Sequence, residues 1–215
     1  MKKQLFRIEK GIIMKSRNII AILRGVRPSE VIQIGNVLVA AGINVIEVPL
    51  NSPKPFDSIT KLKTELGDSA KIGAGTVLTV EDVSKLKDAG GELVVSPNCD
   101  IDVIKATKVA GMKSYPGVFT PTECFAALRA GADGLKFFPG TLIGPAGLKA
   151  MKAVLPVETL TYVVGGADAS NFAEWANIGV TGFGIGSALY KAGMAPEEIA
   201  KKAAEICQAY DEAMT

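Results

Sequence analysis

The sequence predicts an α/β fold, a closed (β/α)8 barrel of parallel strands with an extra N-terminal helix. Two observations predict it. Eight short apolar runs rich in β-branched residues recur along the chain, and the segments between them carry helix start and stop signals. Strands buried on both faces give continuous apolar runs, so these runs indicate a parallel sheet covered by helices. Eight units fit a closed barrel better than an open doubly wound sheet, which is the alternative.

The predicted strands share a short apolar stretch that follows soon after a glycine or a polar segment. The first is Ile-Ile-Ala-Ile-Leu, and the sixth carries a lysine between leucine and two phenylalanines. In chain order the eight strands are expected at 19–23, 45–49, 71–74, 93–96, 113–115, 134–138, 161–164 and 182–185.

Helices are predicted between the strands because proline and capping residues precede each gap and glycine closes it. The expected helix starts are Pro28, Thr79, Asp100, Thr120 and Asp168, and the expected ends are Gly42, Gly90, Gly111, Gly131 and Gly179. No linker rich in proline, glycine or serine divides the chain. We therefore expect one barrel domain over 1–215, with an N-terminal helix at about 3–16, the barrel at about 18–192 and a C-terminal helix at about 196–213.

Composition excludes several classes of function. The 215 residues carry a net charge of +2 with scattered basic residues, so no nucleic-acid groove is expected. The absence of histidine excludes a Ser-His-Asp mechanism and any imidazole metal site. Three widely spaced cysteines predict no zinc site or disulfide framework and fit a reducing cytosol. No apolar stretch approaches membrane-spanning length and no signal-peptide core is evident, so a cytoplasmic protein is expected.

The carboxyl ends of barrel strands form the active site in this architecture, which directs attention to two buried ionisable residues. Lys136 lies among Leu135, Phe137 and Phe138, where desolvation would lower the pKa of the amine and suit it to Schiff-base chemistry. The alternative is a strand-edge lysine with its ammonium in water. Glu47 lies inside a buried strand and would serve as acid and base. Its alternative is a structural ion pair with Arg24 or Lys136.

Further strand ends offer groups for binding an anion. Arg24 would hold a carboxylate or phosphate, or form a salt bridge at the rim. Thr76 would donate to a carboxylate, or cap the next helix. Gly165-Gly166 and Gly186-Ser187 follow the last two strands, where phosphate sites recur, and a short helix is expected from Ser187. The glycines do not form a dinucleotide fingerprint, and no Walker motif occurs.

Several motifs, in order and at similar spacing between about residues 19 and 192, resemble one enzyme family. They are Glu47 in VIEVPL, GAGTV at 73–77, Ser96-Pro97, Pro116-Gly117, LKFFP at 135–139, Gly165-Gly166 and GIGS at 184–187. The resemblance is to the class I 2-keto-3-deoxy-6-phosphogluconate and 6-phosphogalactonate aldolases. AILRG at 21–25 and EVPLNSP at 47–53 look most like the phosphogalactonate branch. Asn51 stands where many phosphogluconate enzymes have arginine, so Arg24 would bind the carboxylate.

The resemblance implies residue roles and a setting. Lys136 would be the Schiff-base lysine and Glu47 the acid/base, Arg24 and Thr76 would hold the keto-acid carboxylate, and Gly165, Gly166, Gly186 and Ser187 would hold the phosphate. The family implies a TIM barrel and a phosphorylated keto-acid sugar as substrate, in Entner–Doudoroff-type carbohydrate breakdown such as galactonate degradation. It also implies a cytoplasmic homotrimer with no metal or cofactor.

Two other classes of function remain as alternatives. A phosphosugar isomerase or epimerase on the same fold normally uses histidine, which this chain lacks. A non-catalytic phosphosugar-binding barrel would keep the phosphate loops but would have no reason to bury a lysine beside a glutamate.

Overall fold

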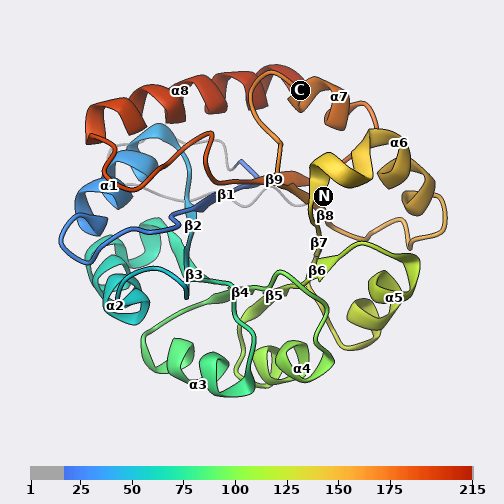
Figure 1. Ribbon diagram of the computed structural model, residues 1–215, viewed down its shortest axis with the longest axis horizontal. Coiled ribbons are helices and arrows are strands. Elements are labelled where there is room, and N and C mark those ends of the chain that lie inside the picture. Colours follow the sequence, from blue (N-terminus) through green and yellow to red (C-terminus); the bar gives the residue numbers. More distant parts are fainter. Residues whose placement is uncertain (1–16, 215) are drawn as a thin grey trace.

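The computed structural model describes residues 17–214 and contains the predicted barrel. All strand pairs are parallel, in the order β5-β4-β3-β2-β1-β9-β8-β7-β6, and the helices form a ring around them (Figure 1). The strands are β1 Ile19–Ile22, β2 Val45–Pro49, β3 Lys71–Gly75, β4 Leu93–Val95, β5 Lys113–Tyr115, β6 Gly117–Val118, β7 Leu135–Phe137, β8 Thr161–Val164 and β9 Gly182–Ile185.

The fifth strand is confirmed as β5, but a second short segment that was not predicted, β6, follows it after Pro116, which is why nine strand segments form a barrel of eight units. Pro116 separates β5 from β6 and has no N–H to donate to a ladder. β5 pairs with β4, and β6 pairs with β7. The carbonyl of Pro116 accepts a hydrogen bond of 2.9 Å from the N–H of Lys136. The covalent chain therefore closes the barrel at the place where the ladder is interrupted.

The helices with predicted starts and ends lie close to the expected positions, with one main exception, and α2 and α6 had no predicted boundaries. They are α1 Val31–Ala41, α2 Pro55–Leu66, α3 Val80–Asp88, α4 Ile101–Val109, α5 Pro121–Arg129, α6 Gly140–Lys152, α7 Phe172–Ala176 and α8 Pro196–Ala213. The segment expected to start its helix at Asp168 starts it only at Phe172, because Asp168 and Asn171 bind the loop backbone instead. The N-terminal helix expected at 3–16 lies outside the described residues.

Local hydrogen bonds explain the helix boundaries. Thr79 and Asp100 accept bonds from the first-turn N–H groups of α3 and α4. Thr120 and Glu123 form a reciprocal capping box at the start of α5. Gly42 ends α1 with a φ of 89°, a left-handed conformation that favours glycine. These caps place each strand's carboxyl end next to a short loop.

Strand alternation divides the side chains between two surfaces. Ile19 and Ala21 on β1, and Leu23 just after it, are fully buried in the hydrophobic core. The alternate residue Ile22 pairs in register with Glu47 on β2. On the other side of the barrel, Lys136 on β7 pairs in register with Gly117 on β6 and Tyr162 on β8. Neighbours in register project from the same face of a sheet. Glu47 and Lys136 therefore enter the barrel interior from opposite sides.

Charged pairs concentrate at the opposite, amino-terminal end of the strands. Glu92 bridges Lys63 and Lys71 at 3.0 and 2.7 Å, just before β4. Asp133 receives hydrogen bonds from Lys113 and from the N–H of Ser114. In this fold the amino-terminal end serves stability and the carboxyl end serves chemistry. Between residues 17 and 214, no helix has both the length and the apolar character needed to cross a bilayer.

Candidate active site

Lys136 and Glu47 are buried inside the barrel, with side chains on β7 and β2. Lys136 is 7% exposed and Glu47 is 2% exposed, so the predicted burial is confirmed and the alternative of a strand-edge lysine in water is wrong. The Nζ atom of Lys136 lies 4.7 Å from the centroid of the Phe138 ring. The arrangement keeps water away from an amine and a carboxyl group that both prefer to be hydrated when charged.

Burial brings the pKa values of these two groups close together. Desolvation raises the pKa of Glu47 to about 7, against the opposing charges of Lys136 and Arg24. Desolvation lowers the pKa of Lys136 to about 8, opposed by Glu47 and assisted by Arg24. The Oε2 atom of Glu47 has no hydrogen-bond partner in the described chain, and no described cation forms an ion pair with this carboxylate. A proton can therefore move on or off either group near neutral pH.

Gly75 makes room for the Glu47 carboxylate. A Cβ atom at Gly75 would lie 2.1 Å from Oε2 of Glu47, closer than any two such atoms can approach. At Gly73, a Cβ atom would lie 2.1 Å from the carbonyl oxygen of Leu93 on the neighbouring strand. Gly75 therefore leaves room for the Glu47 side chain, and Gly73 leaves room for the backbone of the neighbouring strand. Sequence reasoning used this run only as a motif and missed the contact between Gly75 and Glu47.

Thr76 follows β3 directly and has a left-handed backbone. Its φ is 56°, a value that β-branched residues rarely adopt and that costs free energy. The alternative that Thr76 caps the next helix is wrong, because Thr79 is the N-cap of α3 and its side chain accepts from the N–H of Asp82. Strain of this kind is found most often at ligand sites and active sites.

Arg24 lies at the mouth of the barrel and is fixed by the next loop. Its Nη1 donates to Oδ1 of Asn51 at 2.5 Å, and the N–H of Gly25 donates to Oγ of Ser52 at 2.9 Å. Within residues 17–214, Arg24 forms no ion pair, so the expected alternative of a rim salt bridge is wrong. The guanidinium keeps donors for an anion, and Asn51 holds it in place rather than neutralising it.

A cavity of about 730 Å³ opens above the carboxyl ends of β1, β7, β8 and β9. Its size is typical of a small-molecule site. Ile22, Arg24 and Phe138 line its inner side, and the outer side is lined by residues of two loops that include Gly165, Gly166, Gly186, Ser187 and Lys191. Lys136, Glu47 and Thr76 do not line this cavity. Lys136 is next to it, because its Nζ atom lies 4.7 Å from the centroid of the Phe138 ring and Phe138 lines the cavity.

Two loops present unbonded backbone N–H groups to this cavity. Gly165 and Gly166 have φ values of 88° and 84°, and a Cβ atom at Gly166 would lie 2.0 Å from Cγ2 of Thr141. The N–H groups of Gly166, Ser187 and Ala188 donate to no protein atom that the structure describes. Successive free N–H groups in a turn form a concave site for an anion.

The short helix expected from Ser187 is wrong. The carbonyl of Gly186 accepts from the N–H groups of both Leu189 and Tyr190, which closes a single turn. The chain then reverses at Gly193, whose φ is 83°. An anion here would be bound by individual N–H groups and by the nearby Lys191, because one turn has little of the dipole of a full helix.

Asn171 fixes the conformation of the loop that contains Gly165 and Gly166. Its Nδ2 donates to the carbonyl of Gly166 at 2.7 Å, and its Oδ1 accepts from the N–H of Asp168 at 3.1 Å. Sequence reasoning missed Asn171, Asp168 and Lys191, all of which lie within a few residues of the predicted glycines. The signal that could have identified them is their position as polar residues shortly after Gly165-Gly166 and Gly186-Ser187.

Comparison with known proteins identifies the family. The family model for KDPG and KHG aldolases matches residues 11–205. The chain belongs to this aldolase family. A probable 2-dehydro-3-deoxy-6-phosphogalactonate aldolase from Rhizobium meliloti is 48% identical over 91% of this chain and 92% of its own. The 2-dehydro-3-deoxy-6-phosphogalactonate aldolase of Escherichia coli is 44% identical over 91% of this chain and 96% of its own.

Solved structures confirm the predicted fold and the resemblance to class I aldolases. A structure described as native KDPGal is 41% identical, covers 98% of both chains and has a TM-score of 0.89. The phosphogluconate aldolase of Zymomonas mobilis, solved with 3-phosphoglycerate, is 30% identical over 90% of this chain and 92% of its own, with a TM-score of 0.81. A KDPG aldolase from Legionella pneumophila, which holds pyruvate as a covalent carbinolamine, is 26% identical over 93% and 95% of the chains, with a TM-score of 0.77.

The lowered pKa of Lys136 predicts a pH profile for imine formation. Only the free amine is nucleophilic, so the rate of trapping pyruvate with borohydride should rise with pH to a plateau, with a midpoint near 8. Because the Glu47 charge raises the pKa of Lys136, Glu47→Gln should move that midpoint to lower pH. A midpoint near 10.5, the ordinary lysine value, would contradict the desolvated environment.

The bonds of Asn171 predict a selective effect on phosphate binding. Asn171→Ala removes two hydrogen bonds from the loop, and we expect KM for a phosphorylated substrate to rise roughly tenfold. The trapping rate with pyruvate, which has no phosphate, should stay at the wild-type value. Asn177→Ala, the same change at the end of α7, is the control. Equal losses with both substrates would show that Asn171 supports the fold instead.

Proposed function

We propose that this protein is a class I aldolase that cleaves 2-dehydro-3-deoxy-6-phosphogalactonate to pyruvate and D-glyceraldehyde 3-phosphate. The observation that carries the proposal is Lys136, a buried amine with a pKa of about 8 opposite Glu47. Membership of the KDPG and KHG aldolase family supplies the reaction class.

The chemistry follows from an amine and a carboxyl group that titrate near neutral pH. The Lys136 amine attacks the C2 ketone, and loss of water gives a protonated imine. Glu47, directly or through water, takes the proton of the C4 hydroxyl, the C3–C4 bond breaks, and its electron pair moves into the enamine. The aldehyde leaves, C3 is protonated, and water hydrolyses the imine to pyruvate and free Lys136. The imine acts as the electron sink, which divides one difficult step into easier ones.

The remaining residues bind the two charged ends of the substrate. Arg24, oriented by Asn51, and Thr76 would hold the carboxylate beside C2. The free N–H groups of Gly166 and Ser187, with Gly165 and Gly186, would hold the phosphate. Cleavage of the C3–C4 bond needs no metal or cofactor because the imine supplies the electron sink, and phosphate binding needs none because the N–H groups stabilise its charge.

The phosphogalactonate branch is favoured by sequence. The two relatives described above, at 48% and 44% identity, carry that name, whereas the 2-dehydro-3-deoxy-phosphogluconate aldolase of Zymomonas mobilis is 37% identical over 58% of this chain. Asn51, which binds Arg24, also departs from the pattern expected for many phosphogluconate enzymes. The phosphogluconate substrate, which differs in C4 configuration, is the second candidate.

The proposal extends to assembly and location. A protein cage designed by fusing symmetric oligomeric domains contains a region 44% identical to this chain, covering 92% of this chain and 73% of the cage chain, with a TM-score of 0.90. This similarity supports self-association, and we propose a homotrimer that acts in the cytoplasm on a small phosphorylated keto acid.

The substrate is tested by cleavage of the two C4 epimers side by side. We expect kcat/KM for the phosphogalactonate substrate to exceed that for the phosphogluconate substrate at least tenfold, measured by pyruvate release. Lys136→Ala should reduce both rates to background while keeping the wild-type circular dichroism spectrum. A preference for the phosphogluconate substrate would reassign the branch, and near-native turnover by Lys136→Ala would remove the lysine from the mechanism.

A further inference from the structure

Two further hollows lie beside the cavity above the strands. Ala192 lines both the 730 Å³ cavity and a second hollow of about 240 Å³. Arg27 and Pro53 line both that second hollow and a third of about 560 Å³, which extends to Lys54 and Lys61. Because neighbouring hollows share lining residues, the three lie side by side at the mouth of the barrel. We call the second and third hollows together the entry groove.

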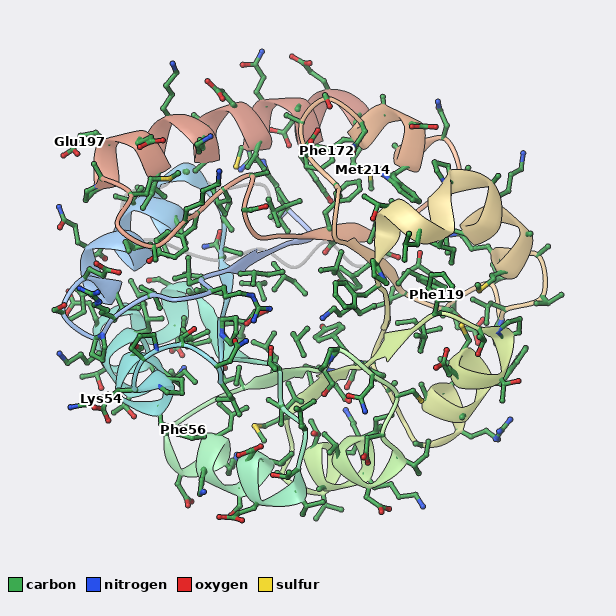
Figure 2. All side chains as sticks on the ribbon, viewed as in Figure 1. Lys54, Phe56, Phe119, Phe172, Glu197 and Met214 are labelled. Atoms are coloured by element: carbon green, nitrogen blue, oxygen red, sulfur yellow. The ribbon has the colours of Figure 1, made fainter. Side chains whose placement is uncertain are left out.

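Cations are spaced along the whole path. Arg24 and Lys191 line its inner end, Arg27 lies in the middle, and Lys54 and Lys61 lie at the outer end. Figure 2 shows Lys54 at the outer edge of the barrel. The Nζ of Lys61 donates to the carbonyl of Pro28 at 2.9 Å, which fixes the ammonium without cancelling its charge. Positive charge therefore reaches from the solvent to the cavity.

The carboxylates along the path are fewer than the cations, and two of the three are engaged by neighbouring donors. The Oε1 atom of Glu30 accepts from the hydroxyl of Tyr190 at 3.0 Å and from the N–H of Arg27 at 3.2 Å. Asp168 accepts from the N–H and the hydroxyl of Ser170. Only Asp57, in the outer hollow, accepts no side-chain bond from the described residues. The lining is net positive in a molecule whose total charge is only +2.

The backbone of Lys54 is a second observation that points to a ligand site at the outer end of the entry groove. Its φ is 43°, a left-handed conformation that is costly for a long side chain, and it lies where α2 begins. Strained residues of this kind persist where the surrounding structure holds them, and they cluster at ligand sites.

We propose that the entry groove binds the phosphorylated keto acid on its way to the cavity, as an initial capture site for multiply charged anions. The assignment of the ligand rests on the proposed function. A cleft lined by one sign of charge concentrates ligands of the opposite sign and raises association rates by about 10- to 10³-fold. The groove would act on capture alone, since none of Arg27, Lys54 and Lys61 contacts Lys136 or Glu47.

The test compares two triple variants with the same change in charge. The groove variant is Arg27→Gln, Lys54→Gln and Lys61→Gln, and the control is Lys87→Gln, Lys105→Gln and Lys149→Gln on the outer faces of α3, α4 and α6. At low ionic strength the groove variant should lose at least fivefold in kcat/KM for the phosphorylated substrate, with kcat unchanged. The loss should disappear in about 1 M salt, where the screening length falls to roughly 3 Å. The control should match the wild type throughout.

A binding measurement separates this proposal from the proposed function. Glyceraldehyde 3-phosphate is titrated into wild type and both variants by calorimetry at low and high salt. Weaker, salt-dependent binding in the groove variant alone supports the capture site even if neither C4 epimer is cleaved. Identical affinities and identical salt dependence of kcat/KM in the two triple variants would overturn it.

Discussion

Burial of one amine and one carboxyl group in the same barrel is the constraint on which the rest of the structure depends. Each group alone would be costly to desolvate, and each lowers the cost of the other. Because neither forms a close ion pair, their pKa values meet near neutrality instead of separating. That balance keeps Lys136 nucleophilic and Glu47 able to exchange a proton, which is the condition that Schiff-base chemistry requires.

The surrounding barrel maintains this balance by geometry. Gly75 leaves the space that the Glu47 carboxylate occupies, and the Phe138 ring lies 4.7 Å from the Lys136 amine. The interruption at Pro116 supplies a carbonyl that fixes the backbone of Lys136. Ion pairs that stabilise the fold lie at the other end of the strands, where they do not perturb the two central groups. The ion pairs that stabilise the fold and the groups that would carry out the reaction therefore lie at opposite ends of the same sheet.

Periodicity and capping signals were sufficient to predict the barrel, most element boundaries and the burial of Lys136 and Glu47, because these depend on local patterns. The division of β5 from β6 and the single turn after Gly186 were missed although each has a local cause. Pro116 has no N–H to donate to a ladder, and the carbonyl of Gly186 accepts from Leu189 and Tyr190 just after it. The bond between Arg24 and Asn51 is different, because it joins the loops that follow two different strands and no local pattern reports it. Roles that involve two distant residues become visible only when the strands are brought together.

The most direct test of the central claim is reductive trapping of pyruvate followed by peptide mass mapping. The account predicts that borohydride converts an imine into a stable pyruvyl adduct on the peptide that contains Gly134–Pro139, with the added mass on Lys136. Lys136→Ala should give no adduct under the same conditions. An adduct on a different lysine, or none at all on the folded wild-type protein, would contradict the assignment of Lys136 as the reactive amine.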